Sequence, residues 1–122
     1  MEFKELTRAE EQIMQVLWQL GKGYVKDVLE LLPEPKPAYN TVSTIIRILE
    51  TKGFVDHEAF GKSHEYFPVI SKEQYQDFAS DKLLSGYFDN SVNRMLSFFV
   101  KKEKIDLKEA DEIMKLIEKL KK

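Results

Sequence analysis

The alternation of apolar and polar residues over residues 39–53 predicts one helix with two different faces. At about 100° per residue, four branched aliphatic side chains fall on one side, namely Val42, Ile45, Ile46 and Leu49. The opposite side carries short amides, hydroxyls and one guanidinium, from Asn40, Thr44, Arg47 and Thr51, with Ser43 at its flank. Solvated helix surfaces usually carry Glu and Lys, which are better helix formers. Such a face suits base edges and phosphates in a DNA major groove; the alternative is a polar face that contacts nothing.

Two shorter helices are predicted ahead of this one. Thr7 and Glu10 have the spacing of a capping box, so the first helix begins there, and a Gly-Lys-Gly sequence ends it after residue 20. Residues 24–25 are predicted to form a very short strand, and a second helix then runs to about Leu32. Three prolines end that helix and force an extended link. Lys36 lies in this link and is expected to be free to reach a phosphate.

A β-hairpin is predicted directly after the polar-faced helix. Its strands are Phe54–Glu58 and Ser63–Phe67, joined by the connection Ala59–Lys62 with a glycine at its tip. Three helices followed by a two-stranded hairpin is the order of elements in a winged helix. In that arrangement the hairpin tip lies beside the DNA backbone, which places Lys62 and Ser63 for phosphate contact.

The two histidines of the chain, His57 and His64, fall on the two predicted strands. They could bind a metal ion across the hairpin, but no third ligand stands at a plausible spacing. We therefore expect no metal site and no cofactor, and we regard His64 as a neighbour of a DNA phosphate.

Residues 71–122 are predicted to form three more helices. The first begins at a second capping box, Ser71 to Gln74, and the others run from about Ser91 to Lys102 and from Asp106 onwards. A helical unit of about 52 residues is marginal alone, so its apolar side chains need another surface. A second copy related by a two-fold axis is the simplest partner. The predicted dimer interface comprises Tyr75, Phe78, Leu83, Tyr87, Phe88, Val92, Met95, Leu96, Phe99, Ile113, Ile117 and Leu120.

The predicted fold is therefore mainly α-helical with two domains. Residues 1–70 form a winged helix-turn-helix, with three helices and a β-hairpin wing, that binds DNA. Residues 71–122 form a three-helix dimerisation domain.

Formal charge counts against tight DNA binding by a single copy. The whole chain carries −2, and residues 1–70 hold 8 Lys and Arg against 11 Asp and Glu. A nucleic-acid-binding domain normally carries a basic patch. Any DNA contact by one copy is therefore expected to be weak and to need a second copy.

Several other classes of protein are excluded by composition. The chain has no cysteine, which removes disulfides, thiolate metal sites and cysteine nucleophiles. The charged N-terminus has no apolar signal segment, and no apolar run is long enough to span a membrane, so we expect a cytoplasmic protein. No catalytic triad or phosphate-binding glycine loop is present, and we expect no enzyme activity.

Four fragments, in this order and spacing, resemble the penicillinase-repressor family of bacterial transcription regulators. They are Thr7–Glu10 leading to Val16–Trp18, Asn40–Thr44 leading to Lys52–Gly53, Gly61–Lys62 leading to Tyr66–Pro68, and Phe99–Glu103. The resemblance covers nearly the whole chain and implies a homodimeric repressor that binds inverted repeats in a promoter.

Carried over residue by residue, the resemblance implies that Asn40, Thr41, Ser43 and Thr44 read bases, with Arg47 and Lys62 on the DNA backbone. Helix geometry agrees for Asn40, Thr44 and Arg47 but places Thr41 nearer the side of the helix. The complete set of candidate DNA-contacting residues is Lys36, Tyr39, Asn40, Thr41, Ser43, Thr44, Arg47, Lys62, Ser63 and His64.

The chain departs from the family pattern in three places. Pro37–Ala38 stands where the family often has Trp-Ser before the recognition helix. In the antibiotic-responsive branch a membrane sensor protease cuts an Asn-Phe bond in the fifth helix, and the matching positions here are Phe98 and Phe99. The copper-responsive branch uses C-terminal cysteine pairs, which this chain lacks. The inducing signal is therefore open, with a proteolytic switch at Phe98–Phe99 as one candidate.

Two functions remain at this point. The first is a dimeric transcriptional repressor that binds inverted-repeat operator DNA through residues 39–52 and the wing. The alternative is a winged helix that docks another protein and has no sequence-specific DNA binding.

Overall fold

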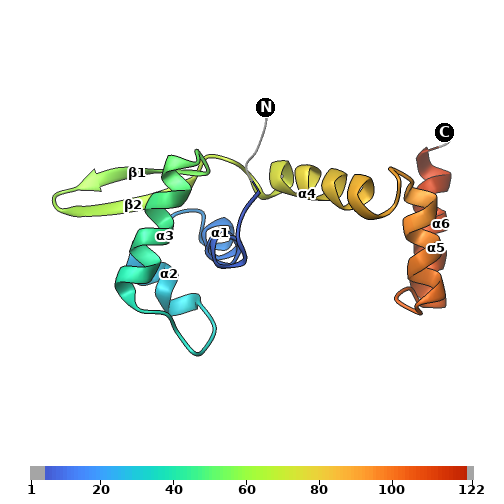
Figure 1. Cartoon of the computed structure of the whole chain (residues 1–122), viewed down its shortest axis with the longest axis horizontal. Coiled ribbons are helices and arrows are strands. Elements are labelled where there is room, and N and C mark those ends of the chain that lie inside the picture. Colours follow the sequence, from blue (N-terminus) through green and yellow to red (C-terminus); the bar gives the residue numbers. More distant parts are fainter. Residues whose placement is uncertain (1–4, 121–122) are drawn as a thin grey trace. The chain divides into compact units, whose positions relative to one another are not determined.

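The computed structural model describes residues 5–120, which form six helices and a two-stranded sheet (Figure 1). They divide between two compact units, of which the first ends at Phe78 and the second begins at Ala79. The elements are α1 (Arg8–Leu20), α2 (Val25–Leu31), α3 (Tyr39–Thr51), β1 (Val55–Phe60), β2 (Ser63–Pro68), α4 (Lys72–Tyr87), α5 (Val92–Lys101) and α6 (Leu107–Leu120). This order confirms the predicted winged helix followed by further helices.

The core of the first unit lies where α1, α2 and α3 meet. Met14 and Leu17 of α1, Val28 of α2, and Val42 and Ile46 of α3 have essentially no exposed surface. Each such side chain contributes about 1.5–3 kcal/mol by leaving water. The buried stripe of α3 therefore fixes which of its sides remains outside, as the apolar pattern predicts.

The end of α3 determines where the hairpin begins. Gly53 adopts a positive φ of 86°, and its N–H donates to the Glu50 carbonyl at 3.0 Å. The next N–H, from Phe54, reaches back to the Leu49 carbonyl at 2.9 Å, which completes a Schellman motif. Phe54 is fully buried, so the helix end and the first strand are attached to the same core.

The hairpin is longer and its turn tighter than predicted. Its strands pair antiparallel from Val55 opposite Pro68 to Phe60 opposite Ser63, which leaves only Gly61 and Lys62 in the turn. Gly61 has a φ of +62°, a conformation that two-residue hairpin turns require and that glycine adopts without strain. Ala59 and Phe60 therefore belong to β1 instead of the connection.

The short strand predicted at residues 24–25 is misplaced by one or two residues. Gly23 is the residue that pairs with the hairpin, and it exchanges two backbone hydrogen bonds with Tyr66, at 2.8 and 2.9 Å. Tyr24 instead caps α2, and Val25 is the first residue of that helix. Because β-branched Val25 is also acceptable in the first turn of a helix, its residue type did not distinguish the two structures.

A buried ion pair joins the start of α1 to the end of α3. Thr7 and Glu10 form the predicted capping box, and Glu10 also accepts a hydrogen bond from Lys52 Nζ at 2.8 Å. Burial favours the neutral acid, but the Lys52 ammonium and the Thr7 N–H outweigh it and hold the pKa of Glu10 below its ordinary value of 4.5. This pair fixes α3 against α1.

The first unit extends further than the predicted boundary at residue 70. Helix α4 begins at the predicted capping box of Ser71 and Gln74. Its Tyr75 is buried against Phe54 and Trp18, with ring centroids 5.7 and 5.9 Å away. Phe78 packs against the same core. This corrects the prediction that Tyr75 lies at a dimer interface, because its ring is buried within one chain; Phe78 is only partly buried, and its place at an interface stays a prediction.

The second unit contains the rest of α4 with α5 and α6. Asp89 and Asn90 adopt positive φ values of 51° and 61° in the turn that ends α4, while Gly86 lies within the helix. Helices α5 and α6 have apolar faces but contain no buried residue. Among residues 5–120, no helix combines the length and the apolar character needed to cross a membrane.

Candidate nucleic-acid interface

The outer face of α3 presents the polar side chains that its sequence predicts. Asn40, Thr44 and Arg47 are exposed along its centre line, and Ser43 is partly exposed on the side toward the hairpin. The hydroxyl of Thr51 donates to the Arg47 carbonyl at 3.1 Å. No Lys, Asp or Glu interrupts this line between residues 39 and 49. The face can therefore approach base edges without desolvating a carboxylate.

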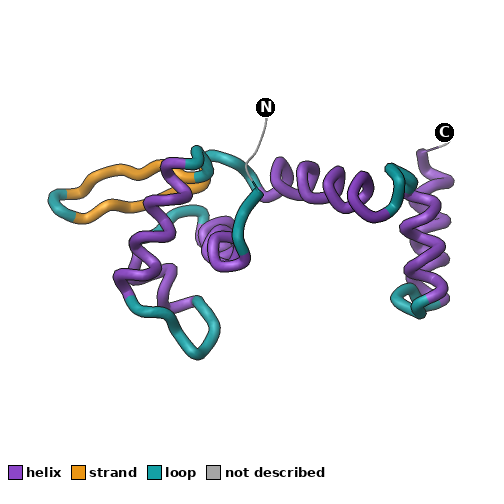
Figure 2. The backbone as a smooth tube through the Cα atoms, viewed as in Figure 1, coloured by secondary structure: helices purple, strands orange, loops and turns teal. Residues whose placement is uncertain are grey.

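Thr41 lies away from that centre line. It lines a second, smaller hollow of about 310 Å³ on the side of α3 that faces the proline-rich link, together with Ile45 and Pro37. The link itself is the long loop between α2 and α3 (Figure 2). Base contact by Thr41 stays a prediction, and the structure places the residue at the edge of the exposed face.

Lys36 has a structural role that the sequence did not reveal. Its ammonium donates to the carbonyls of Leu29, Glu30 and Leu32 at 3.0, 2.6 and 3.0 Å. These are carbonyls at the C-terminal end of α2, where the helix dipole is negative. The expectation that the Lys36 ammonium is free to reach a phosphate is therefore wrong, and contact of Lys36 with DNA stays a prediction.

A groove of about 620 Å³ runs between α3 and the hairpin. Six of the predicted DNA-contacting residues line it: Tyr39, Ser43 and Arg47 from α3, and Lys62, Ser63 and His64 from the hairpin. Asn40 and Thr44 lie outside this groove on the outer face of α3, and Thr41 lies on the opposite flank.

The groove also contains residues that sequence reasoning missed. Tyr24 and Lys26, at the start of α2, form its far wall, and Phe60 stands at the tip of the wing. Phe60 is 51% exposed and Tyr39 is 53% exposed. The signal for Phe60 was present in the sequence, since a two-residue turn at Gly61 places it opposite Ser63.

The charge of the groove differs from the charge of the domain. Lys26, Arg47 and Lys62 line it, and no Asp or Glu is among its described lining residues. Residues 1–70 are nevertheless net negative. The acidic side chains therefore lie elsewhere on the unit, and the groove itself favours a polyanion.

Tyr66 forms the floor of the groove and is 4% exposed. Burial raises the pKa of its hydroxyl and the nearby Glu50 carboxylate adds to the effect, while the guanidinium of Arg47, hydrogen-bonded to the hydroxyl, acts in the opposite direction. Arg47 is thereby positioned between the groove floor and the outer face of α3.

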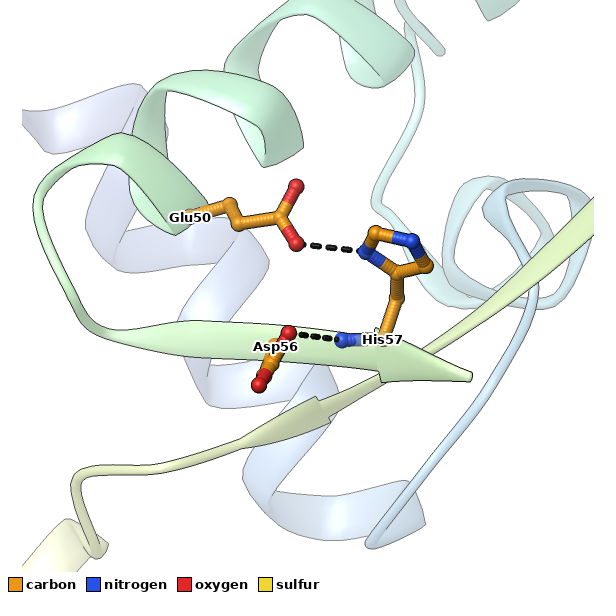
Figure 3. A group of neighbouring side chains, drawn as sticks. All are labelled: Glu50, Asp56 and His57. Carbon is orange, nitrogen blue, oxygen red and sulfur yellow. Dashed lines mark hydrogen bonds and ion pairs between the residues drawn. The ribbon is translucent and has the colours of Figure 1, made fainter. Parts of the chain in front are cut away.

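Glu50, Asp56 and His57 form a small cluster where α3 meets β1 (Figure 3). Their ligand atoms lie within 4.8 Å of one another, so the fold brings two carboxylates close to His57 that the sequence spacing did not predict. His57 Nδ1 is already hydrogen-bonded to Glu50, and Asp56 accepts the backbone N–H of His57 at 2.8 Å. The cluster is therefore better explained as a link between helix and strand than as a metal site.

The predicted dimer-interface residues of the second unit are largely uncovered. Leu83, Tyr87, Val92, Ile117 and Leu120 are exposed, with Tyr87 at 81% and Leu120 at 85%. Met95, Leu96 and Ile113 are half-buried. Phe88 and Phe99 contact each other and Phe98, with ring centroids 5.7 to 6.3 Å apart.

Comparison with known proteins agrees with this geometry. The family model described as penicillinase repressor matches residues 6–119. The chain belongs to the penicillinase repressor family. It is 22% identical to the methicillin resistance regulatory protein MecI of Staphylococcus aureus over 116 residues, which is 94% of each chain. It is 23% identical to the penicillinase repressor of Bacillus licheniformis over 115 residues, 93% of this chain and 90% of that one.

A solved structure of Bordetella bronchiseptica BpsR, from work on the regulation of its DNA binding by 6-hydroxynicotinic acid, has the same fold. Its TM-score is 0.50 at 14% identity, covering 97% of this chain and 76% of that one.

Membership of this repressor family establishes the general class of function. The chain is a DNA-binding transcriptional repressor, and it is not an enzyme. Both predictions are thereby confirmed, and DNA is favoured over the alternative of a protein-docking winged helix.

Proposed function

We propose that this repressor binds inverted-repeat operator DNA as a homodimer, with one winged helix on each half-site. The observation that carries the proposal is the groove between α3 and the wing, where Lys26, Arg47 and Lys62 gather without a carboxylate. It adjoins a helix face made of amides and hydroxyls. The two surfaces together supply phosphate contact and base contact, the two components of specific recognition.

In this proposal Asn40 and Thr44 read base edges from the centre of α3. An Asn side chain can make two hydrogen bonds to adenine in the major groove, and Thr can contact either a base edge or a thymine methyl group. Ser43 and Tyr39 lie nearer the wing and contact the adjacent DNA backbone. Thr41 contacts the edge of the operator half-site.

The wing and the start of α2 hold the DNA backbone on either side of α3. Lys62 and Ser63 lie at the hairpin tip and Lys26 lies across the groove. Lysine binds phosphate as a point charge and fixes the register of the protein on the duplex without reading sequence. His64 stands beside them and adds a hydrogen bond to a phosphate.

The second unit holds two copies together. Helices α5 and α6 have amphipathic sequences and no residue buried within one chain, so a partner must cover their apolar faces. The unit supplies Leu83, Tyr87, Val92, Ile117 and Leu120 as exposed contacts. Tyr75 is left out because it is buried in the winged-helix core.

Dimerisation compensates for the weak charge of each head. Linking two binding modules raises overall affinity by about 10²–10⁴ without any new contact, provided that both sites can be occupied together. Loss of the dimer would then release the repressor from DNA.

A proteolytic switch is one way to lose the dimer. The bond between Phe98 and Phe99 lies inside α5 (Val92–Lys101), and Phe98 is 41% exposed. Cleavage there would divide the helix that carries Val92 and Met95. A membrane sensor protease as the partner stays a prediction, as does a cytoplasmic location.

Selection of bound duplexes from random sequence tests the proposal. The full-length protein is expected to enrich an inverted repeat, with a half-site spacing that reflects the two-fold axis. Enrichment of a single half-site without symmetry, or no enrichment at low salt, would contradict it.

A further inference from the structure

An aromatic side chain is exposed at the tip of the wing. Phe60 is the last residue of β1 and pairs with Ser63 across the turn of Gly61 and Lys62. Its exposed fraction is 51%, and it is not among the apolar side chains that pack against the described core. An aromatic ring left in water forgoes the free energy that its burial would release. Phe60 is therefore available for a contact outside the chain.

The groove beside the hairpin determines which part of a DNA duplex the tip can meet. Lys26, Arg47 and Lys62 line this groove of about 620 Å³, and none of its described lining residues is acidic, so it suits one phosphate strand. In B-DNA each strand separates the major groove from the minor groove. With α3 in the major groove and a strand between α3 and the hairpin, the hairpin tip lies on the far side of that strand, in the minor groove.

The length of the tip matches the depth of the minor groove. Glu58 lies opposite Glu65 in the hairpin, two residues before Phe60, and phosphates would repel both carboxylates. Residues 59–64, beyond this pair, include no acidic residue, and two residues of antiparallel strand rise about 7 Å. The minor groove is about 7.5 Å deep. The tip, which projects past the helices of the first unit in Figure 1, can therefore place Phe60 inside the groove while the acidic pair stays outside.

We propose that Phe60 enters the minor groove beside each half-site and selects an A·T base pair there. This inference deepens the proposed function and rests on it. In the minor groove an A·T pair presents only acceptors, whereas a G·C pair adds the exocyclic amino group of guanine. The apolar ring offers no partner to that donor and strips water from it, so a G·C pair at this position is disfavoured.

Lys62 and Phe60 have separate roles in this contact. Lys62 lines the groove and binds a phosphate at the border of the minor groove, where a narrow A·T-rich stretch concentrates negative potential. Its contribution depends on salt and not on the base pair. The ring of Phe60 carries no charge, so its contribution depends on the base pair and not on salt. The two residues can therefore be tested independently.

The test uses full-length protein and the symmetric duplex obtained by selection. Each base pair of the half-site and its flanks is replaced in turn, in both half-sites together, by A·T, G·C or inosine·cytosine. Inosine lacks the amino group of guanine, so its pair with cytosine resembles A·T in the minor groove and G·C in the major groove. Affinity is measured by fluorescence titration for wild type, Phe60→Ala, Phe60→Thr and Phe60→Leu.

Leu31→Ala is the matched control. Leu31 is 47% exposed and is the last residue of α2, whereas the residues of α2 that line the groove are at its start. The variant removes a similar exposed apolar side chain from the same unit. It should match wild type on every duplex.

Wild type should show one position per half-site where G·C weakens binding by at least about fivefold and inosine·cytosine restores it, the effect of one unpaired donor. Phe60→Ala should bind the A·T duplex about fivefold more weakly per half-site, because about half of a Phe side chain is no longer buried. It should also bind A·T and G·C equally at this position. Phe60→Thr, which keeps a strand-forming residue, should behave in the same way. Phe60→Leu, which keeps an apolar side chain, should retain the preference.

The inference is overturned if Phe60→Ala and Phe60→Thr keep the discrimination against G·C, or if they bind as tightly as wild type. It is also overturned if inosine·cytosine weakens binding as much as G·C, since the base pair is then read from the major groove. A midpoint of urea denaturation equal to that of wild type shows that a variant is folded. Failure of the proposed function gives a different result, because wild type itself would then show no preference for the symmetric duplex.

Discussion

Replacement of Lys62 by glutamine tests whether the groove carries the phosphate contacts. Each head places three cations in the groove, Lys26, Arg47 and Lys62, so a dimer offers six. Each neutralised phosphate contributes about −0.9 to the slope of log K against log salt, which gives a slope of about −5 for the wild-type dimer. The variant loses two of the six contacts, and its slope should become shallower by about 1.8.

The assay is a fluorescence titration of full-length protein against a labelled operator duplex, over about 50 to 200 mM salt. Across this range wild-type affinity should fall about a thousandfold and that of the Lys62→Gln variant about a hundredfold. The pH is kept the same throughout the salt series.

Lys22→Gln is the matched control. Lys22 belongs to the same unit, is exposed, and lies 4.0 Å from Glu65 without lining the groove. The same change in net charge should leave its slope unchanged. Equal slopes for Lys62→Gln and Lys22→Gln would refute the reasoning, because overall charge and not the groove would then determine the electrostatic contribution.

Three further predictions concern base reading, domain structure and acid stability. Asn40→Ala should weaken operator binding by about 1–3 kcal/mol and relax the preference at one base pair of each half-site; a titration series with substituted duplexes measures this, and an equal loss for every sequence would contradict it. A fragment ending at Phe78 should unfold cooperatively and be more stable than one ending at residue 70, because it retains Tyr75, yet it should bind the operator at least about 100-fold more weakly than the full chain; comparable affinity would show that the second unit is not needed. Glu10→Gln should lower the free energy of unfolding by about 1–3 kcal/mol near neutral pH, measured by urea denaturation. Since the pKa of Glu10 is lowered on folding, its contribution is complete above the ordinary value of 4.5 and is lost as pH falls through the folded-state pKa, so the difference between variant and wild type should shrink in acid.

Helix positions and the buried stripe of α3 were predictable because period-3.6 patterns and capping boxes are local signals. Thr7 with Glu10 and Ser71 with Gln74 both form the boxes that their spacing predicts. The outward position of Asn40, Thr44 and Arg47 followed directly from the burial of Val42 and Ile46.

The errors concern contacts that local sequence patterns do not encode. In the sequence Tyr75 belongs to an apolar helical stripe. The neighbouring residues do not indicate that Phe54 and Trp18 cover its ring. The sequence around Lys36 indicates a free cation in a loop. In the structure its ammonium donates hydrogen bonds to carbonyls at the end of α2. The contribution of Lys26 to the groove depends on how α2 packs beside the hairpin, which the Gly23 and Tyr66 pairing determines.

The overall charge of residues 1–70 was a misleading guide for a related reason. A net charge sums over all faces of a domain, while DNA meets one face. The fold gathers three cations from α2, α3 and the wing into one groove. These three cations are far apart along the chain, so composition alone does not reveal that they form a cluster.

The central claim is that two copies read one symmetric site through α3 and the groove. The most direct test compares duplexes that contain both half-sites, one half-site or neither, with full-length protein and with sedimentation to count the bound copies. We predict two copies on the symmetric duplex and an affinity about 10²–10⁴ higher than on the single half-site. One copy bound, or equal affinity for the single half-site and the symmetric duplex, would contradict the account.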